Sequence, residues 1–137
     1  MAGSEWPLLL DDPSAVTALF REVPDLTGFR LISLHVDERG PGVTACFERY
    51  GLPDLSPPRW REQRLNAFAF ALLLDAVTGL RIAGWHGTPP DRIALTSAGG
   101  GPGVRFTVSG PHHDVEVTAA TARVTRVTAF LASPAAR

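Results

Sequence analysis

The sequence predicts one α+β domain that is mostly antiparallel β, with about eight strands and a single amphipathic helix near the N-terminus. From Phe29 onward apolar and polar residues alternate with a period of two, which is typical of strands with one buried face. Clusters of glycine and proline interrupt this pattern at short intervals and favour hairpin turns. Because an open sheet of this width leaves long edges unpaired, we expect a curled sheet, a sandwich or a barrel.

The expected helix precedes the strands. Asp12 followed by Pro13 favours a helix start, since the carboxylate accepts hydrogen bonds from free amides and proline fixes the first helical φ. Pro24 ends the pattern. The apolar residues between these points recur at helical spacing and predict one buried stripe, formed by Val16, Leu19, Phe20 and Val23.

The expected strands run from the first hairpin to the C-terminus. Residues 29–36 and 43–47 alternate on either side of a turn at 38–42, which predicts a hairpin with an apolar inner face. The other strands are expected at 65–77, 80–85, 92–96, 104–109, 115–119 and 123–130. We expect a single domain over residues 1–137, with a core at 6–131 and a frayed tail at 132–137.

The segment 65–77 is apolar on both faces. One face carries large side chains and the other is mostly alanine: Phe68, Phe70, Leu72 and Leu74 against Ala67, Ala69, Ala71 and Leu73. Its place among strands favours a central strand covered on both sides, although periodicity alone leaves a helix open. The small alanine face allows close approach, so we expect the N-terminal helix to pack there.

The charge balance argues against nucleic acid and membrane partners. Thirteen basic and fourteen acidic side chains give a formal net charge of -1, so the positive field that phosphate backbones select is missing. The chain has no apolar run of about 18 residues and no signal-peptide pattern at its N-terminus. Cys46 is the only cysteine, which excludes an internal disulfide and favours a cytoplasmic protein.

The sequence carries no catalytic or cofactor motif, and we expect no enzyme, cofactor or metal site. Glycine-rich residues 99–103 lack the Lys-Ser/Thr that follows a phosphate loop and are interpreted as a hairpin loop. His112 and His113 are interpreted as solvated turn histidines, because adjacent strand residues point in opposite directions. His35 and Asp37 form a same-face pair at strand spacing that adds to His112, His113 and Asp114 as candidate metal ligands, but we favour solvated turn histidines over a metal site.

Two segments are rich in large amphipathic side chains. Arg59-Trp60-Arg61 and Trp85-His86 combine wide apolar area with directional donors, a composition enriched at protein interfaces. We interpret Trp60 as closing one end of the β core and Trp85 as lying inside it, with the arginines and the histidine on the surface.

These features occur in an order that resembles a known family. Trp6 and a short helix precede the hairpin LISLHVDERGPGVTACFE, the PPRW of residues 57–60, an apolar strand, and GLRIAGW, which ends at Trp85. Over roughly Trp6 to Phe130 the chain resembles the immunity protein 50 family of bacterial polymorphic-toxin systems. The resemblance implies a cytoplasmic antitoxin that binds and blocks a cognate toxin domain without catalytic residues. It also implies that Trp60 and Trp85, which match the family's recurring tryptophans, are structural.

An antitoxin of this kind acts by stoichiometric protein–protein inhibition, for which an interface of about 1,600 Å² with a few anchors is sufficient. We predict that charged and polar residues of the turns and connections contact the toxin: Asp37, Glu38, Glu48, Asp54, Arg59, Arg61, Glu62 and His86. The acidic members of this set can form a patch that fits a basic nuclease toxin, but solvated loop charges explain them equally well.

Two other functions stay open. A curled sheet can enclose a cavity, and a small apolar ligand then binds among the aromatic side chains of Phe47, Phe68, Phe70 and Phe106. Alternatively, His35, Asp37 and residues near His112 assemble the site of a small hydrolase.

Overall fold

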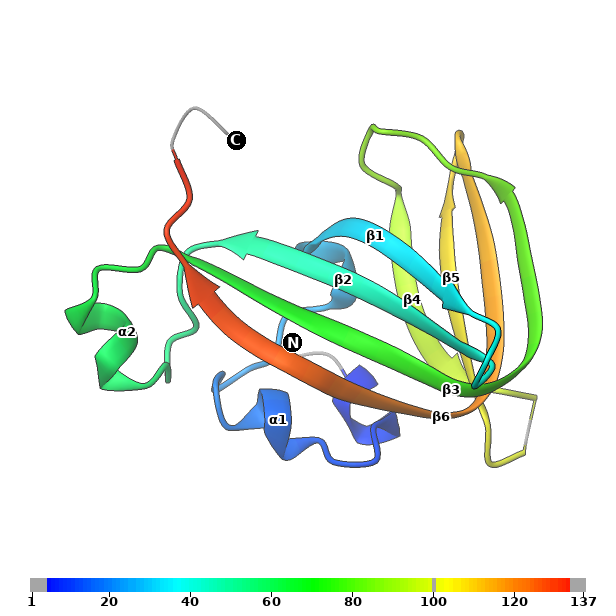
Figure 1. Ribbon diagram of the computed structural model, residues 1–137, viewed down its shortest axis with the longest axis horizontal. Coiled ribbons are helices and arrows are strands. Elements are labelled where there is room, and N and C mark those ends of the chain that lie inside the picture. Colours follow the sequence, from blue (N-terminus) through cyan, green and yellow to red (C-terminus); the bar gives the residue numbers. More distant parts are fainter. Residues whose placement is uncertain (1–4, 100, 134–137) are drawn as a thin grey trace.

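The computed structural model describes residues 5–99 and 101–133, and its main feature is one antiparallel sheet of six strands (Figure 1). The order across the sheet is β1-β2-β3-β6-β5-β4. The strands are β1 (Arg30–Asp37), β2 (Gly42–Tyr50), β3 (Ala67–Gly84), β4 (Arg92–Ser97), β5 (Val104–Gly110) and β6 (His113–Phe130). The α+β, mostly antiparallel class is confirmed, whereas the sheet is not closed and the prediction of about eight strands is wrong.

The two longest strands account for the difference in strand number. β3 and β6 have 18 residues each. The weak alternation at residues 78–79 and 120–122 predicts two strand breaks, but the ladder between β3 and β6 continues on both sides of these positions. Register shifts, one of them between Val77 and Gly79, absorb the irregularity without ending the pairing.

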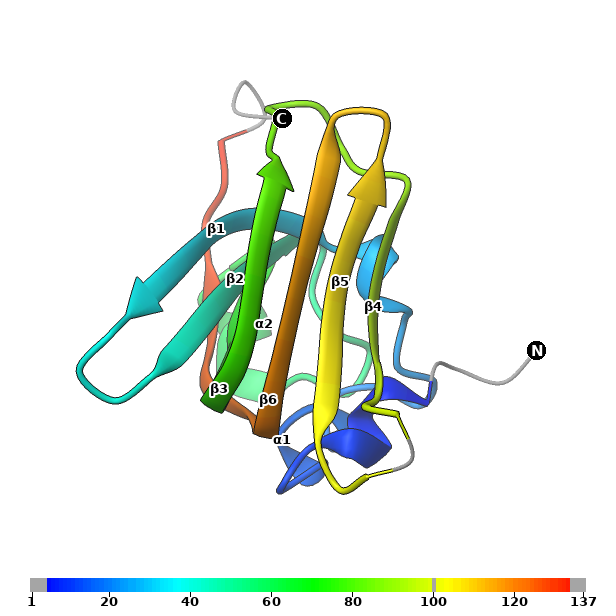
Figure 2. The ribbon, with the colours of Figure 1, turned by 90° about the vertical axis from the view of Figure 1, so that its right-hand side faces the viewer.

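β3 and β6 bend together, so that one sheet forms two halves whose strands run in different directions (Figures 1 and 2). At the bend Ala76 has a φ of 52°, and Asp75 Oδ1 accepts a hydrogen bond of 2.9 Å from its amide. The proximal half contains β1, β2, β3 up to Asp75 and β6 from Thr121; the distal half contains the rest of β3 and β6 with β5 and β4. The pairing of β2 with β3 ends at Leu74, so in the distal half β3 is an edge strand.

An aromatic cluster fills the space between the two halves. Phe70 stacks on Phe47 with 5.0 Å between ring centroids and meets Phe29 in a T-shaped contact at 5.1 Å. Phe47 in turn contacts Phe106 of the distal half at 6.3 Å, and Trp6 stacks on Phe70 at 5.8 Å. All five side chains are buried. Because such ring contacts add to the free energy of area burial, this cluster joins both halves to the N-terminal segment.

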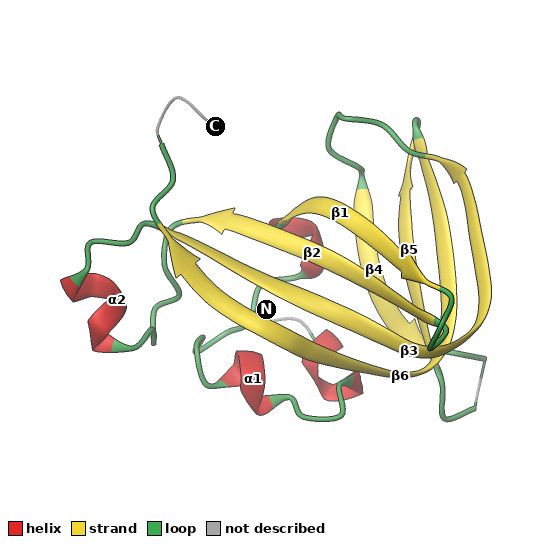
Figure 3. Ribbon diagram, viewed as in Figure 1, coloured by secondary structure: helices red, strands yellow, loops and turns green. Residues whose placement is uncertain are grey.

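Helical structure in the described part of the chain is confined to four short elements. They are two 3-10 helices, η1 (Trp6–Leu9) and η2 (Leu26–Gly28), and two α-helices, α1 (Ser14–Thr17) and α2 (Pro58–Glu62) (Figure 3). The expected N-terminal helix is reduced to α1, next to which Asp12 Oδ1 accepts hydrogen bonds from the amide and hydroxyl of Ser14. A helix of about ten residues is marginal on its own, so burial of the N-terminal segment on the sheet decides its conformation.

The N-terminal segment packs on the face of β3 opposite to the one predicted. All four predicted stripe residues are buried, but Phe20 contacts Phe68 of the aromatic face in a T-shaped arrangement at 5.8 Å. On the alanine face Ala69 and Leu73 remain half-buried. Large rings offer the segment more apolar area than alanine methyl groups, so the aromatic face gains more from this contact. β3 is central in the proximal half, as predicted, but the expected contact between helix and alanines is wrong.

Two predicted features include residues that the structure does not describe. The glycine-rich segment 99–103 does connect β4 to β5, and its residue 100 lies outside the described residues. Ala132, at the start of the predicted tail, exchanges hydrogen bonds of 2.6 and 3.1 Å with the side chain of Asn66. Residues 134–137 of that tail lie outside the described residues.

The aromatic cluster predicts a large effect of a single substitution. Phe70→Ala removes a buried ring that contacts both Phe47 and Trp6, and we expect it to lower the free energy of unfolding by about 3–5 kcal/mol. Urea denaturation followed by far-UV circular dichroism measures this change. The exposed Leu131 provides the matched control, because Leu131→Ala is expected to stay within about 0.5 kcal/mol of the parent. Equal effects of the two substitutions would contradict this account of the core.

Candidate functional site

The residues predicted to contact a partner lie in separate parts of the structure. Asp37 and Glu38 are at the turn between β1 and β2, and Glu48 lies within β2. Asp54 and the three predicted residues of α2 belong to the connection from β2 to β3, whereas His86 lies in the loop from β3 to β4. These residues thus belong to several different elements of the fold. Their role as contacts stays a prediction.

The charge of Asp37 is compensated within its own turn. Arg39 Nε and Nη2 donate hydrogen bonds of 3.2 and 3.3 Å to the Asp37 carboxylate. The amide of Arg39 donates a further bond of 3.0 Å. The side-chain hydrogen bond from Arg39, followed by that from its amide, lowers the pKa of Asp37 below its ordinary value. Asp37 is therefore paired, whereas Glu38, the other acidic residue beside this turn, forms no ion pair in the described residues.

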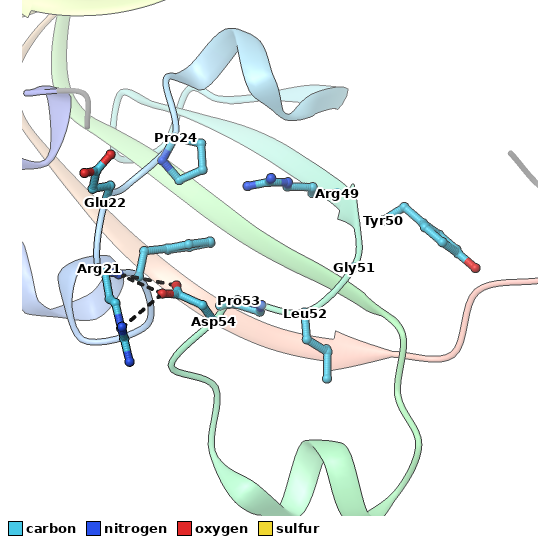
Figure 4. Close-up of a pocket in the computed structure, with 10 residues that line it drawn as sticks. Arg21, Glu22, Pro24, Arg49, Tyr50, Gly51, Leu52, Pro53 and Asp54 are labelled. Atoms are coloured by element: carbon cyan, nitrogen blue, oxygen red, sulfur yellow. Dashed lines mark hydrogen bonds and ion pairs between the residues drawn. The ribbon is translucent and has the colours of Figure 1, made fainter. Parts of the chain in front are cut away.

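The connection from β2 to β3 borders a pocket of about 470 Å³ (Figure 4). Arg21 donates its amide to the carboxylate of Asp54 at 3.3 and 3.4 Å, and its Nε lies 3.7 Å from Asp54 Oδ2. Arg61 Nη2 donates to the carbonyl oxygens of Pro53 and Asp54 at 3.4 and 3.2 Å. Asp54 and Arg61 thus hold the connection in place, which gives both residues a structural role beside their predicted contact role.

Helix α2 is anchored by Trp60 and exposes its charges. The Trp60 side chain is 8% exposed and its ring lies 6.2 Å from that of Phe68, in agreement with the expectation that it closes one end of the core. Arg59 and Glu62 are exposed and form no ion pair within residues 5–99 and 101–133. These two side chains are therefore available to a partner.

Trp85 lies on the surface, so the expectation that it sits inside the core is wrong. Its side chain is 45% exposed. The reason is topological: Trp85 follows the part of β3 that forms the edge of the distal half, where no neighbouring strand covers it. One side of the indole packs against His113 in a T-shaped contact at 6.0 Å. Part of this large apolar side chain is therefore held in place while the rest faces solvent.

Three histidines gather beside Trp85. His113 is 6% exposed, which corrects the expectation of a solvated turn residue: β6 begins at His113, so its side chain points inward like that of Val115. His113 Nε2 donates a hydrogen bond of 2.9 Å to the carbonyl of His86. His86 Nδ1 accepts from the amide of Thr88 at 3.1 Å, and its ring lies 4.8 Å from that of the exposed His112. Sequence reasoning missed this cluster because β3 and β6 are far apart along the chain.

A second pocket of about 400 Å³ adjoins this cluster. It lies between the start of β1 and the loop from β3 to β4, and it is lined by residues 27, 29–32, 85–90, 93 and 113. Two exposed apolar side chains, Ile32 and Trp85, face it from opposite elements. Its lining includes Arg30 and His86 but no carboxylate. The pocket therefore combines apolar contact area with hydrogen-bond donors.

The residues weighed from the sequence as a metal, hydrolase or ligand site lie as follows. No group of three or more His, Cys, Asp and Glu side chains within residues 5–99 and 101–133 is placed to hold a metal ion. The Asp37 carboxylate is bound by Arg39, and the ring of His112 lies against His86. The four phenylalanines considered as the lining of a ligand cavity are buried and contact other rings, so they form the core. No helix among the described residues has the length and apolar character needed to cross a membrane.

Comparison with known families identifies the chain. The sequence model of the family described as Immunity protein 50 matches residues 12–130. The chain belongs to the immunity protein 50 family. No curated protein and no solved structure matches it. Family membership indicates an immunity protein, with a toxin-type protein as its partner and a role other than catalysis.

The buried histidine gives a prediction for the loop that carries Trp85. His113→Phe keeps a ring beside Trp85 but removes the donor to the His86 carbonyl. We expect the free energy of unfolding to fall by about 1 kcal/mol, since a partly buried hydrogen bond is lost. Amide exchange at residues 86–90 is expected to become faster, as measured by hydrogen–deuterium exchange. His112→Ala, in the exposed neighbour, is the control and is expected to leave both quantities nearly unchanged; a reversed order of the two effects would contradict the assigned hydrogen bond.

Proposed function

We propose that this chain is an antitoxin that binds one cognate toxin domain of a polymorphic-toxin system and neutralises it by stoichiometric protein–protein inhibition. The observation that carries the proposal is the family match, which extends over residues 12–130 and thus over the whole sheet. The proposal places the protein in the bacterial cytoplasm, where it protects the producing cell. It assigns no catalytic step, cofactor or metal to the chain.

The architecture supports inhibition by occupation of a surface. An inhibitor needs a preformed surface with a few anchoring side chains, because the ordering of loose segments on binding costs free energy. Here the surface rests on one continuous sheet with an aromatic core, and the exposed Trp85 is fixed by its contact with His113. The predicted contacts at the β1–β2 turn, on α2 and at His86 remain part of the proposal.

The proposal is tested by titration. The toxin domain encoded beside this chain's gene is purified, and its activity is measured with increasing amounts of this protein. We expect the activity to fall linearly and to vanish at an equimolar ratio, with a 1:1 complex in size-exclusion chromatography coupled to light scattering. An immunity protein of another family and similar size is the control and is expected to leave the toxin active.

Two outcomes would contradict stoichiometric inhibition. Loss of toxin activity at far less than one equivalent would indicate that the chain destroys or modifies the toxin. Full toxin activity in the presence of excess protein, together with toxicity that persists on co-expression in a bacterial host, would remove the antitoxin function itself.

A further inference from the structure

The N-terminal segment closes one side of the folded sheet and leaves the other side open. The edge of β4 is capped by Thr27, whose hydroxyl exchanges hydrogen bonds of 3.0 and 3.2 Å with the amide and carbonyl of Ile93. In Figure 2 the N-terminal elements lie toward β4, whereas the β1–β2 turn projects on the opposite side, beyond β3. Within the described residues, β1 and residues 79–82 of β3 have neighbouring strands on one side only.

Apolar side chains on the open side point toward the core but remain exposed. Cross-strand partners share a face, so Val36 lies on the face of the buried Val43, and Leu80 and Ile82 lie on the face of the buried Val117 and Val115. Their exposed fractions are nevertheless 50% for Val36, 42% for Leu80 and 47% for Ile82. We call these three residues, together with Ile32 and Trp85, the open mouth of the sheet. It holds five of the nine large apolar side chains that are exposed in the described residues.

The charges beside Leu80 and Ile82 are compensated, whereas Arg30 at the other side of the mouth is not. Arg81, between Leu80 and Ile82, pairs with Asp114 at 2.7 Å and with Glu116 at 3.4 Å. Arg30 lies opposite Glu48 in the β1–β2 ladder but forms no ion pair in the described part of the chain. It lines the pocket that contains Ile32 and Trp85, whose lining includes no carboxylate, and it also lines a separate pocket that it shares with Glu48. An acidic side chain is the complement of this end of the mouth, and an apolar one is the complement of the rest.

The backbone adds a requirement on the shape of the partner. Residues 79–82 of β3 pair regularly with β6 and have no strand on their other side. Edge strands of this kind accept an additional strand through main-chain hydrogen bonds, while side-chain pockets supply specificity. The partner that fits is therefore an extended segment.

We propose that the toxin docks on the open mouth through an extended segment that places an apolar side chain between Ile32 and Trp85 and a carboxylate beside Arg30. This inference rests on the proposed antitoxin function and specifies its contact surface. It differs from the sequence prediction, in which acidic residues of the chain meet a basic toxin, because the free charge at this site is positive.

The test compares the affinities of matched variants for the same toxin domain by biolayer interferometry. Trp85→Ala and Arg30→Glu are each expected to weaken binding roughly tenfold or more, which corresponds to loss of an interface anchor. Leu8→Ala and Arg126→Glu replace an exposed apolar residue and an exposed arginine away from the mouth and are expected to change the affinity less than about threefold. Thermal unfolding verifies that each variant is folded, and Arg30→Lys is expected to recover most of the binding that Arg30→Glu loses.

Hydrogen–deuterium exchange provides a readout on the parent chain that needs no substitution. Residues 31–36 and 79–82 are expected to become protected when the toxin is added. Protection confined to residues 51–63, next to the pocket of Figure 4, would overturn the proposal in favour of that surface. Protection of residues 79–82 by a second copy of this chain, without toxin, would also overturn it. If the parent chain neutralises the toxin but Trp85→Ala and Arg30→Glu bind as tightly, the docking surface is wrong while the antitoxin function stands; failure of the parent chain to bind the toxin removes both.

Discussion

The continuous pairing of β3 with β6 is the constraint on which the rest of the structure depends. The two strands run side by side through both halves of the sheet, so neither half is complete without them. The bend near Ala76 turns the distal half over the proximal one and brings Phe106 onto Phe47. One ladder therefore fixes the strand order and also forms the two walls between which the aromatic core packs.

The same constraint creates the exposed surface. β3 has β2 as a neighbour in the proximal half and loses it at the bend, so its distal part becomes an edge although the strand itself continues. Complete burial of a large apolar side chain stabilises a fold by about 1.5–3 kcal/mol. Leu80, Ile82 and Trp85 are nearly half exposed and forgo much of this stabilisation, although the N-terminal segment of the same chain covers the opposite side. Stability alone does not account for an uncovered apolar edge, whereas a partner that completes the burial does.

The sequence predicted the local features of this fold better than its long-range ones. The alternation in residues 29–47 predicted the β1–β2 hairpin, since neighbouring strands in the chain pair through a short turn. The contact between β3 and β6 joins segments separated by the whole β4–β5 hairpin, and no local pattern records it. Three errors have this common origin: the division of both long strands, the burial expected for Trp85 and the solvent exposure expected for His113. The burial of Val16, Leu19, Phe20 and Val23 was predictable from their spacing, but the face that they contact was not, because both faces of β3 are apolar.

Most charged side chains near the open mouth are compensated by a close neighbour, and this bears on how the proposed partner is recognised. Arg81 forms ion pairs with two carboxylates of β6, and Asp37 forms one with an arginine of its own turn. Arg30 forms no ion pair in the described residues and borders a groove whose lining lacks carboxylates. Apolar contact and main-chain pairing then supply the affinity of an incoming segment, and one charge sets its register, because a slip by one residue turns each side chain of a strand to the other face. A chain of nearly neutral composition can in this way be selective for one partner without an extended charged patch.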